Sequence, residues 1–404
     1  MTPRALRSAK TLRTLILLTA MLVSSSAAAH DVSTPPTISS PTQLQLRAIA
    51  KRAPMILRER AFPRLSFLEN VAVKAPTLRS YTLRIRLFTE WCSLRRFQWT
   101  TDIGLDSALV EYLDELFFKG MSADDGSKLI AGLKYFLPSL SRTGPASLPR
   151  AVRALTGWRK TAPTAERLPL PLVCLAAMVG TIIYAGDLEM GRRWWLQFAT
   201  YMRPGEVDNL KVENIVSPLR AAGLRYRHYG IVLHRHEDLP GKTGLRDEAI
   251  LLDQSPELDG VLAALTTGRP PTQRLWKATG SVSHQAFVET VELLHLTALK
   301  PTRYSLRHGG ASEDLLGRKR SLAEIKRRGR WASDMSLKRY TKETRLMSEL
   351  AKVDPRIIKY GREIQQDISA FLLGVKRPHP PPLGPSIARA HKLLRSRLPA
   401  HRQC

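Results

Sequence analysis

A nearly uninterrupted run of apolar residues, 172–186, constrains the fold more than any other part of the chain. The run contains no charged residue and lies between Pro171 and Asp187. It is shorter than the about 20 residues that a membrane-spanning helix needs, which disfavours a transmembrane segment. A helix that is apolar on every side must be covered on every side. We therefore predict a buried core helix inside a domain large enough to surround it.

The chain is long and strongly basic. Its 404 residues are enough for two to three domains of about 150 residues each. Because 43% of the residues are hydrophobic, a wholly disordered chain is excluded. Lys and Arg number 63 against 35 Asp and Glu, which gives a formal net charge of +28. A charge of this size and sign favours nucleic acid as the partner.

The cysteines and the N-terminal residues indicate different cellular locations. Cys92, Cys174 and Cys404 are too far apart for a zinc site or a disulfide framework, which fits the cytoplasm or the nucleus. Residues 1–29, however, combine a basic start, a short apolar run and small residues, without any acidic residue before Asp31. This pattern fits a secretory signal, an organelle transit peptide or an untargeted basic extension, and all three stay open.

Helical periodicity begins after a linker rich in Pro, Ser and Thr at 30–45. Apolar residues recur every three or four positions at Tyr81, Ile85, Phe88 and Trp91, which predicts one buried helix face. Further helices are expected at 109–118 and 127–136. Together they predict a small all-helical domain that ends near residue 158, followed by a proline-containing linker at 159–171.

The second half combines helices with one hairpin. Strand patterns at 229–236 and 248–252 flank a Pro-Gly-Lys-Thr-Gly turn, with Lys242 near its tip. Residues 256–350 are expected to be helical, and the chain ends in a basic, proline-rich tail. The predicted fold class is mainly α with a small β-sheet (α+β). The predicted regions are a leader and linker at 1–65, a helical domain at 66–160, a second domain at 165–350 and the tail at 351–404.

Three motifs in the second half carry the candidate chemistry. The first, at 200–210, contains Arg203 and Glu206; the second, at 304–311, contains Arg307; the third is Gly329-Arg330-Trp331, with Tyr340 nine residues after the tryptophan. In order and spacing these motifs resemble the tyrosine recombinase (phage integrase) family, which also keeps a mobile lysine in a hairpin, here Lys242. The resemblance covers about residues 70–350, and the helical domain is similar to that family's core-binding domain.

The resemblance implies a role for each matched residue. Tyr340 would attack a DNA phosphate and form a 3′-phosphotyrosyl link. Arg203 and Arg307 would clamp the phosphate oxygens, and Lys242 would protonate the leaving 5′ oxygen. Trp331 would donate its indole N–H to a phosphate oxygen. Glu206 would orient Arg203, because residues three apart share a helix face.

Tyr304 departs from the family pattern, which most often has histidine three residues before the second arginine. A tyrosine hydroxyl can donate a hydrogen bond to phosphate, but its pKa of about 10 makes it a poor proton acceptor near neutrality. The departure bears on how Tyr340 loses its proton. His308 is next to Arg307 in sequence, but we expect it to point elsewhere on the helix.

Two patterns that suggest other chemistry are rejected. Gly241-Lys242-Thr243 lacks the first glycine of a phosphate-binding loop, because that position is His236, and the lysine joins two strands rather than a strand and a helix. His234 and His236 have no third metal ligand nearby. The sequence therefore predicts no metal and no nucleotide cofactor.

The predicted activity is site-specific cleavage and rejoining of DNA strands without metal or ATP. Double-stranded DNA is the expected partner, bound by a homotetramer, with no small-molecule substrate and no membrane span. A type IB topoisomerase-like enzyme and a catalytically decayed DNA-binding protein are the alternatives. The expected location is nuclear or cytoplasmic, with targeting by residues 1–29 left open.

Overall fold

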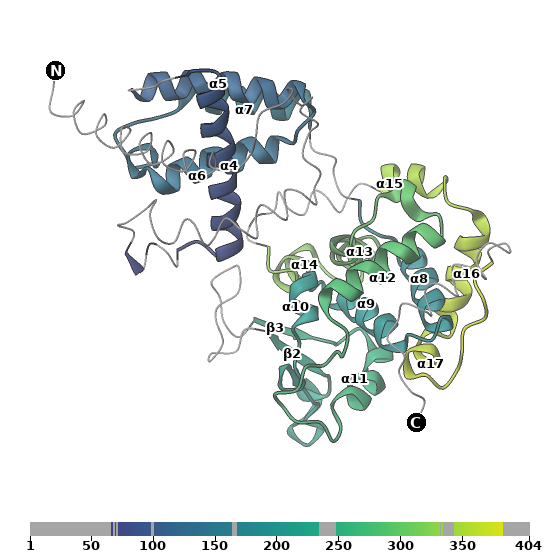
Figure 1. Cartoon of the computed structure of the whole chain (residues 1–404). Coiled ribbons are helices and arrows are strands. Elements are labelled where there is room, and N and C mark those ends of the chain that lie inside the picture. The colour runs from purple at the N-terminus through teal and green to yellow at the C-terminus, as the bar shows by residue number, and fades with distance from the viewer. Residues whose placement is uncertain are drawn as a thin grey trace, which may run out of the picture. The chain divides into compact units, whose positions relative to one another are not determined.

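The chain forms two compact units, divided between residues 165 and 166 (Figure 1). The computed structural model describes residues 66, 67, 69, 72–97, 101–163, 168–233, 248–331, 333 and 343–382. Each unit has a separate cluster of buried apolar side chains. The predicted leader at 1–65 lies outside the described residues.

The N-terminal unit is all helical in its described residues. Its elements are α4 (Ala75–Leu94), α5 (Asp102–Phe118), α6 (Ala123–Phe136), the 3₁₀ turn η1 (Pro138–Leu140) and α7 (Pro149–Thr161). Helix α4 packs against α6, and α5 packs against α7. The helices predicted from the periodicity are confirmed. Helix α5 begins earlier than predicted because the Thr101 hydroxyl caps it, accepting the Gly104 N–H at 3.1 Å.

The C-terminal unit is also mainly helical, with a small sheet. Its helices are α8 (Leu172–Tyr184), α9 (Leu188–Thr200), α10 (Pro204–Asp208), α11 (Asp259–Thr266), α12 (Gly280–Leu293), α13 (Arg303–Leu316), α14 (Leu322–Arg328), α15 (Glu343–Leu350), α16 (Pro355–Gln366) and α17 (Ile368–Leu373). Short 3₁₀ turns are η2 (Val212–Asn214), η3 (Arg220–Ala222), η4 (Leu224–Tyr226), η5 (Pro256–Leu258) and η6 (Leu296–Leu299). The predicted combination of helices and a small sheet is confirmed.

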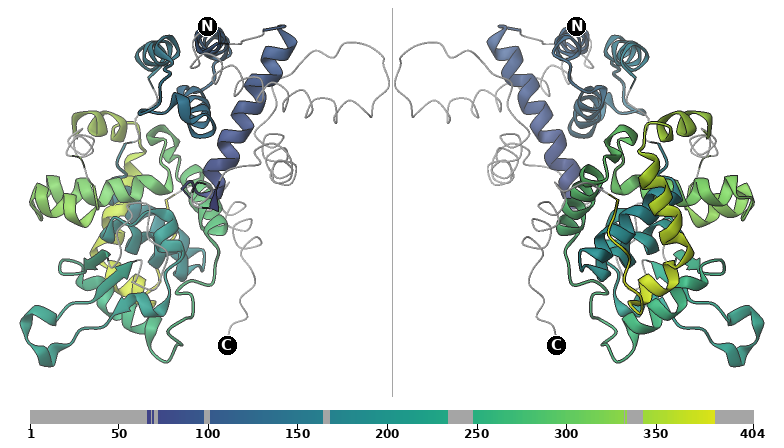
Figure 2. Two further views of the ribbon diagram at one scale, coloured as in Figure 1. Left: turned by 90° about the vertical axis from the view of Figure 1, so that its left-hand side faces the viewer. Right: turned by 90° about the vertical axis from the view of Figure 1, so that its right-hand side faces the viewer.

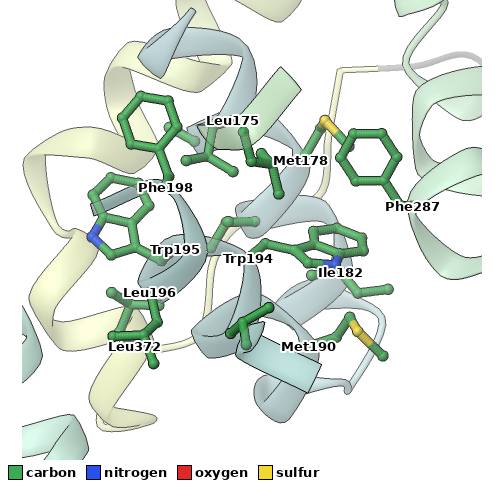
Figure 3. Packing of buried hydrophobic residues seen from close by; sticks show 14 of the residues in the cluster. Leu175, Met178, Ile182, Met190, Trp194, Trp195, Leu196, Phe198, Phe287 and Leu372 are labelled. Atoms are coloured by element: carbon green, nitrogen blue, oxygen red, sulfur yellow. The ribbon is translucent and has the colours of Figure 1, made fainter. Parts of the chain in front are cut away.

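Helix α8 is the predicted buried core helix. Every residue from 174 to 183 is buried, and α9 and α16 both pack against the helix. Figure 3 shows the apolar side chains of α8 and α9, including Met178 and Trp194, with Phe287 of α12 beside them. The Trp194 indole donates to the Ser283 hydroxyl at 3.2 Å, so its one polar atom is satisfied inside the core. None of the helices in the described ranges is long and apolar enough to cross a membrane.

The sheet has three antiparallel strands in the order β1 (Ile215–Val216), β2 (Gly230–Leu233) and β3 (Glu248–Leu251). Ile231 of β2 lies opposite Ile250 of β3, and both side chains are buried. The two predicted strands are confirmed in the described residues. β2 begins one residue later than expected and β3 ends one residue earlier, and residues 234–236 lie outside the described residues. The two-residue β1 was not predicted, because it is too short to show alternation. The turn between β2 and β3 lies outside the described residues.

The predicted tail boundary at residue 350 is too early. Residues 355–373 form α16 and α17, and α16 lies beside α8 (Figure 2). Ile357, Tyr360 and Ile364 on α16 are fully or almost fully buried in the main core. Arg192 of α9 donates to the Leu372 carbonyl at 2.6 Å and fastens α17. The C-terminal unit therefore extends at least to residue 373. The net charge of the whole tail, most of which lies after residue 375, obscured an apolar face with helical spacing.

Replacement of one buried side chain on α16 should destabilise the C-terminal unit. Ile364→Ala leaves a cavity beside α8, so we expect the free energy of unfolding to fall by about 2–5 kcal/mol. Lys359→Ala on the same helix is the matched control, because its side chain is 79% exposed. Urea denaturation of the full chain measures both. Equal unfolding midpoints for the two variants would contradict the placement of α16 in the core.

Candidate active site

Arg203 lies at the start of α10, where its own side chain and backbone are both held by Glu206. The Arg203 backbone N–H donates to Glu206 Oε2 at 2.7 Å, and its Nη1 donates to Glu206 Oε1. The expected contact between the two residues is present, but it crosses the beginning of the helix rather than running along one face. Burial lowers the pKa of Arg203, and the charge and hydrogen bond of Glu206 outweigh it, so the pKa is raised overall.

Arg307 lies in α13 and is only 2% exposed. Its Nη1 donates to the Tyr201 carbonyl at 2.6 Å and its Nη2 to the Gly329 carbonyl. The Trp331 ring covers the guanidinium, with its centroid 4.7 Å from Cζ. Burial, with the nearby charges of Arg330 and Arg203, lowers the pKa of Arg307 to about 10. Within the described residues, no hydrogen bond of Arg307 goes to a carboxylate.

A close approach of two helices places Arg307. A Cβ atom on Gly310 would lie 2.0 Å from the Phe198 carbonyl oxygen at the end of α9, so only glycine allows α13 to come this near. The Leu170 N–H also donates to the Ser305 carbonyl of α13 at 3.1 Å. The second motif thus has small residues after Arg307 because of packing, not chemistry.

A carboxylate that is 14% exposed joins α10 to two other helices. Asp208 at the end of α10 accepts from Arg193 Nε of α9 at 3.0 Å and from Arg303 Nη1 of α13 at 2.8 Å. Arg193 is completely buried, and Arg303 is 4% exposed. Because Arg203 begins α10 and Arg307 follows Arg303 by one turn, this network sets the distance between the two candidate phosphate-binding arginines.

The Gly329-Arg330-Trp331 turn ends α14. The Arg330 N–H bonds the Arg327 carbonyl at 3.0 Å and the Trp331 N–H bonds the Lys326 carbonyl at 3.1 Å, which is a Schellman motif. A Cβ atom on Gly329 would lie 1.8 Å from the Trp331 ring, so glycine is required for the indole to fold back. The ring then stacks on Tyr201, with centroids 6.3 Å apart.

Arg330 is part of the cluster, although it was not among the predicted site residues. Its Nη2 donates to Glu206 Oε2, and its Nε lies 3.2 Å from Oε2 of Glu248 at the start of β3. Burial lowers the pKa of Arg330, and the charges of Glu206 and Glu248 oppose this shift. The only sequence signal was its place between the glycine and the tryptophan of the third motif.

Tyr304 lies one turn before His308 on α13, and their ring centroids are 5.9 Å apart. A charge on Tyr304 would raise the pKa of Arg203, Arg307 and Arg330, so its hydroxyl lies within electrostatic reach of all three. His308 is buried, and its ring lies beside that of Tyr304.

The structure thus brings four of the predicted residues together, namely Arg203, Tyr304, Arg307 and Trp331. The two others, Lys242 and Tyr340, lie outside the described residues, as do His234 and His236. Among the side chains that are described, no group of three His, Cys, Asp or Glu residues could hold a metal ion.

Comparisons with known proteins place this arrangement in a known fold. No protein-family model and no curated protein matches the chain. A crystal structure of XerH site-specific recombinase bound to palindromic difH substrate, a post-cleavage complex, aligns with a TM-score of 0.50 and 14% identity over 85% of this chain and 96% of that chain. The chain has the tyrosine recombinase fold. A pre-cleavage XerH complex aligns at 15% identity over 84% of this chain and 95% of that chain, with a TM-score of 0.43.

Removal of the charge on Glu206 should destabilise the tyrosine recombinase fold. Glu206→Gln leaves Arg203 and Arg330 without their shared carboxylate, and we expect a loss of about 3 kcal/mol in the free energy of unfolding. Glu213→Gln is the control, because its ion pair with Lys211 is far more exposed and is expected to contribute under about 1 kcal/mol. Denaturant unfolding measures both variants. A Glu206→Gln variant no less stable than Glu213→Gln would contradict the shared-carboxylate arrangement.

Proposed function

We propose that the protein is a site-specific DNA recombinase that cleaves and rejoins strands through Tyr340. The observation that carries the proposal is the state of Arg307. Its guanidinium is buried under an indole, fixed by two backbone carbonyls and flanked by two further arginines. A buried cation without a bonded carboxylate is expected to attract an anion, and a phosphodiester is the anion that suits an arginine fork.

The proposed reaction balances without an added cofactor. The Tyr340 hydroxyl oxygen attacks phosphorus and its proton passes to solvent water, while the bond from phosphorus to the 5′ oxygen breaks and Lys242 gives a proton to the departing oxygen. Both proton transfers are reversed when the strands rejoin. Arg203 and Arg307 stabilise the two non-bridging oxygens as charge builds on them. A 5′ hydroxyl then attacks the phosphotyrosyl link, which restores a phosphodiester and frees Tyr340. No metal ion and no ATP enters these steps.

Trp331 and Tyr304 would act around the same phosphate. The face of the Trp331 ring lies on Arg307, so the indole excludes water from the guanidinium, and its edge N–H is the proposed donor to a phosphate oxygen. Tyr304, within electrostatic reach of the three arginines, would donate through its hydroxyl. Because a tyrosine hydroxyl is a poor proton acceptor near neutrality, deprotonation of Tyr340 lacks a good base at this position.

The remaining parts of the proposal concern assembly and place. The N-terminal helical unit would act as the core-binding clamp on double-stranded DNA, and the C-terminal unit as the catalytic domain. A homotetramer would bring two DNA segments together for strand exchange. A nuclear or cytoplasmic location fits the two described cysteines, which are free and buried.

The decisive test offers the full chain a library of duplexes that are nicked so that a covalent intermediate is trapped. We expect a protein–DNA adduct that migrates more slowly on a denaturing gel, and we expect Tyr340→Phe to abolish it. Tyr226→Phe is the control and should form the adduct normally, because Tyr226 is 51% exposed and lies outside the cluster. Absence of an adduct from the wild type on every duplex would favour a DNA-binding protein without catalysis.

A second test addresses the departure at Tyr304. Tyr304→His supplies a group that can accept a proton near neutrality, so we expect strand cleavage to become at least about tenfold faster. Single-turnover cleavage on the same nicked duplex measures the change. Tyr304→Phe should be slower than the wild type, because it removes the hydroxyl donor. An unchanged rate for Tyr304→His would show that the tyrosine is as effective as histidine here.

A further inference from the structure

Three arginines occupy a backbone position that favours glycine. Arg96, Arg318 and Arg330 each follow a helix end and have φ angles of 53°, 50° and 53°. Each closes a Schellman motif; for example, the Arg318 N–H bonds the Leu315 carbonyl at 3.2 Å, and the next N–H, of Lys319, bonds the Asp314 carbonyl at 2.9 Å. A side chain at this left-handed position is disfavoured relative to glycine.

The side chains of the three arginines have different surroundings. Arg96 and Arg318 are exposed, so their side chains meet solvent at little cost. The Arg330 side chain is only 7% exposed and has charged contacts with two carboxylates. Its Nη1 is buried and makes no hydrogen bond within the described residues. Backbone conformation and burial both oppose an arginine at residue 330, so its contacts must account for its presence.

Those contacts join three parts of the proposed site. Glu206 is shared by Arg330 and Arg203, so the position of Arg330 affects how Arg203 is held. Glu248 is the first residue of β3, the strand that follows the segment with Lys242. Arg330 itself directly precedes Trp331, whose ring covers Arg307.

We propose that Arg330 is a positioning residue that holds Glu206, and through it Arg203, in a fixed relation to β3. Arg330 does not touch the phosphate in this proposal; it acts through the carboxylate that it shares. The inference rests on the proposed function for its effect on the reaction, whereas the physical coupling between Arg330 and Glu248 stands without it. A purely structural role would lower stability without a selective effect on the chemical step.

The first experiment compares Arg330→Gly with Arg318→Gly, which makes the same change at the same backbone position with an exposed side chain. Single-turnover cleavage is measured on a nicked duplex at saturating concentration, together with the Kd for that duplex. We expect Arg330→Gly to lower the cleavage rate at least about tenfold, which is the loss of one positioned group, with the Kd within about threefold of the wild type. Arg318→Gly should cleave at the wild-type rate.

Equal rates for Arg330→Gly and the wild type would overturn the proposal. If Arg330→Gly does not fold, Arg330→Lys decides, because it keeps the charge but cannot reach both carboxylates as a fork. A reduced rate with an unchanged Kd supports positioning, and a wild-type rate for Arg330→Lys overturns it.

The second experiment does not need activity. Urea unfolding midpoints are measured for Arg330→Lys, Glu248→Gln and the double variant. If Arg330 and Glu248 are coupled, the midpoint shift caused by Arg330→Lys should be at least halved in the Glu248→Gln background. Additive shifts would overturn the coupling. If the wild type forms no adduct with DNA, that result counts against the proposed function alone. The comparison of the single and double variants would still decide whether Arg330 is coupled to Glu248 of β3.

Discussion

The position of the candidate site depends on one partly exposed carboxylate, that of Asp208. It pairs with Arg193 of α9 and Arg303 of α13, and removing it would leave two buried cations without a counter-charge. Helix α10 is only five residues long and has little stability of its own. The attachment of α10 through Asp208 therefore fixes the position of Arg203 at the start of that helix. The same carboxylate holds Arg303, so it also fixes Arg307, which lies one turn further along α13. The geometry of the cluster follows from packing beneath it.

The buried arginines differ in what satisfies them. Arg193 and Arg303 bond a carboxylate directly, as expected for cations that hold a fold together. Arg328 donates to the carbonyls of Leu251 and Ala199, and the carboxylate of Asp253 lies 3.9 Å away. Arg307 is held by carbonyls and an indole instead, and its pKa is lowered to about 10. Among the described residues, Arg307 is therefore the one of these four arginines without an ion pair to a carboxylate.

The sequence predicted those parts of the molecule in which residue type and spacing carry the information. The buried helix at 172–184, the two strands of the hairpin and the grouping of Arg203 with Arg307 are of this kind. Arg330 could not be identified, because burial of a charged side chain depends on partners from α10 and β3 that are distant in sequence. Helix α16 was missed for another reason. Its apolar positions Ile357, Tyr360 and Ile364 do have helical spacing, but the helix was grouped with the basic, proline-rich residues that follow it after residue 375.

The net charge of +28 and the candidate site would contribute in different ways to the binding of a nucleic acid. Exposed cations bind a polyanion through counterion release, which gives affinity without placing any particular phosphate. In the cluster, Arg203 and Arg330 pair with Glu206, and Arg330 also lies beside Glu248, whereas Arg307 hydrogen-bonds neither glutamate. The burial of Arg307 is a cost that the folded protein has already met. A phosphate bound there would offset that cost without any rearrangement of the guanidinium. In the proposed reaction, charge builds on the phosphate oxygens as the bond to Tyr340 forms, so a fixed and incompletely neutralised cluster would favour the transition state over the ground state.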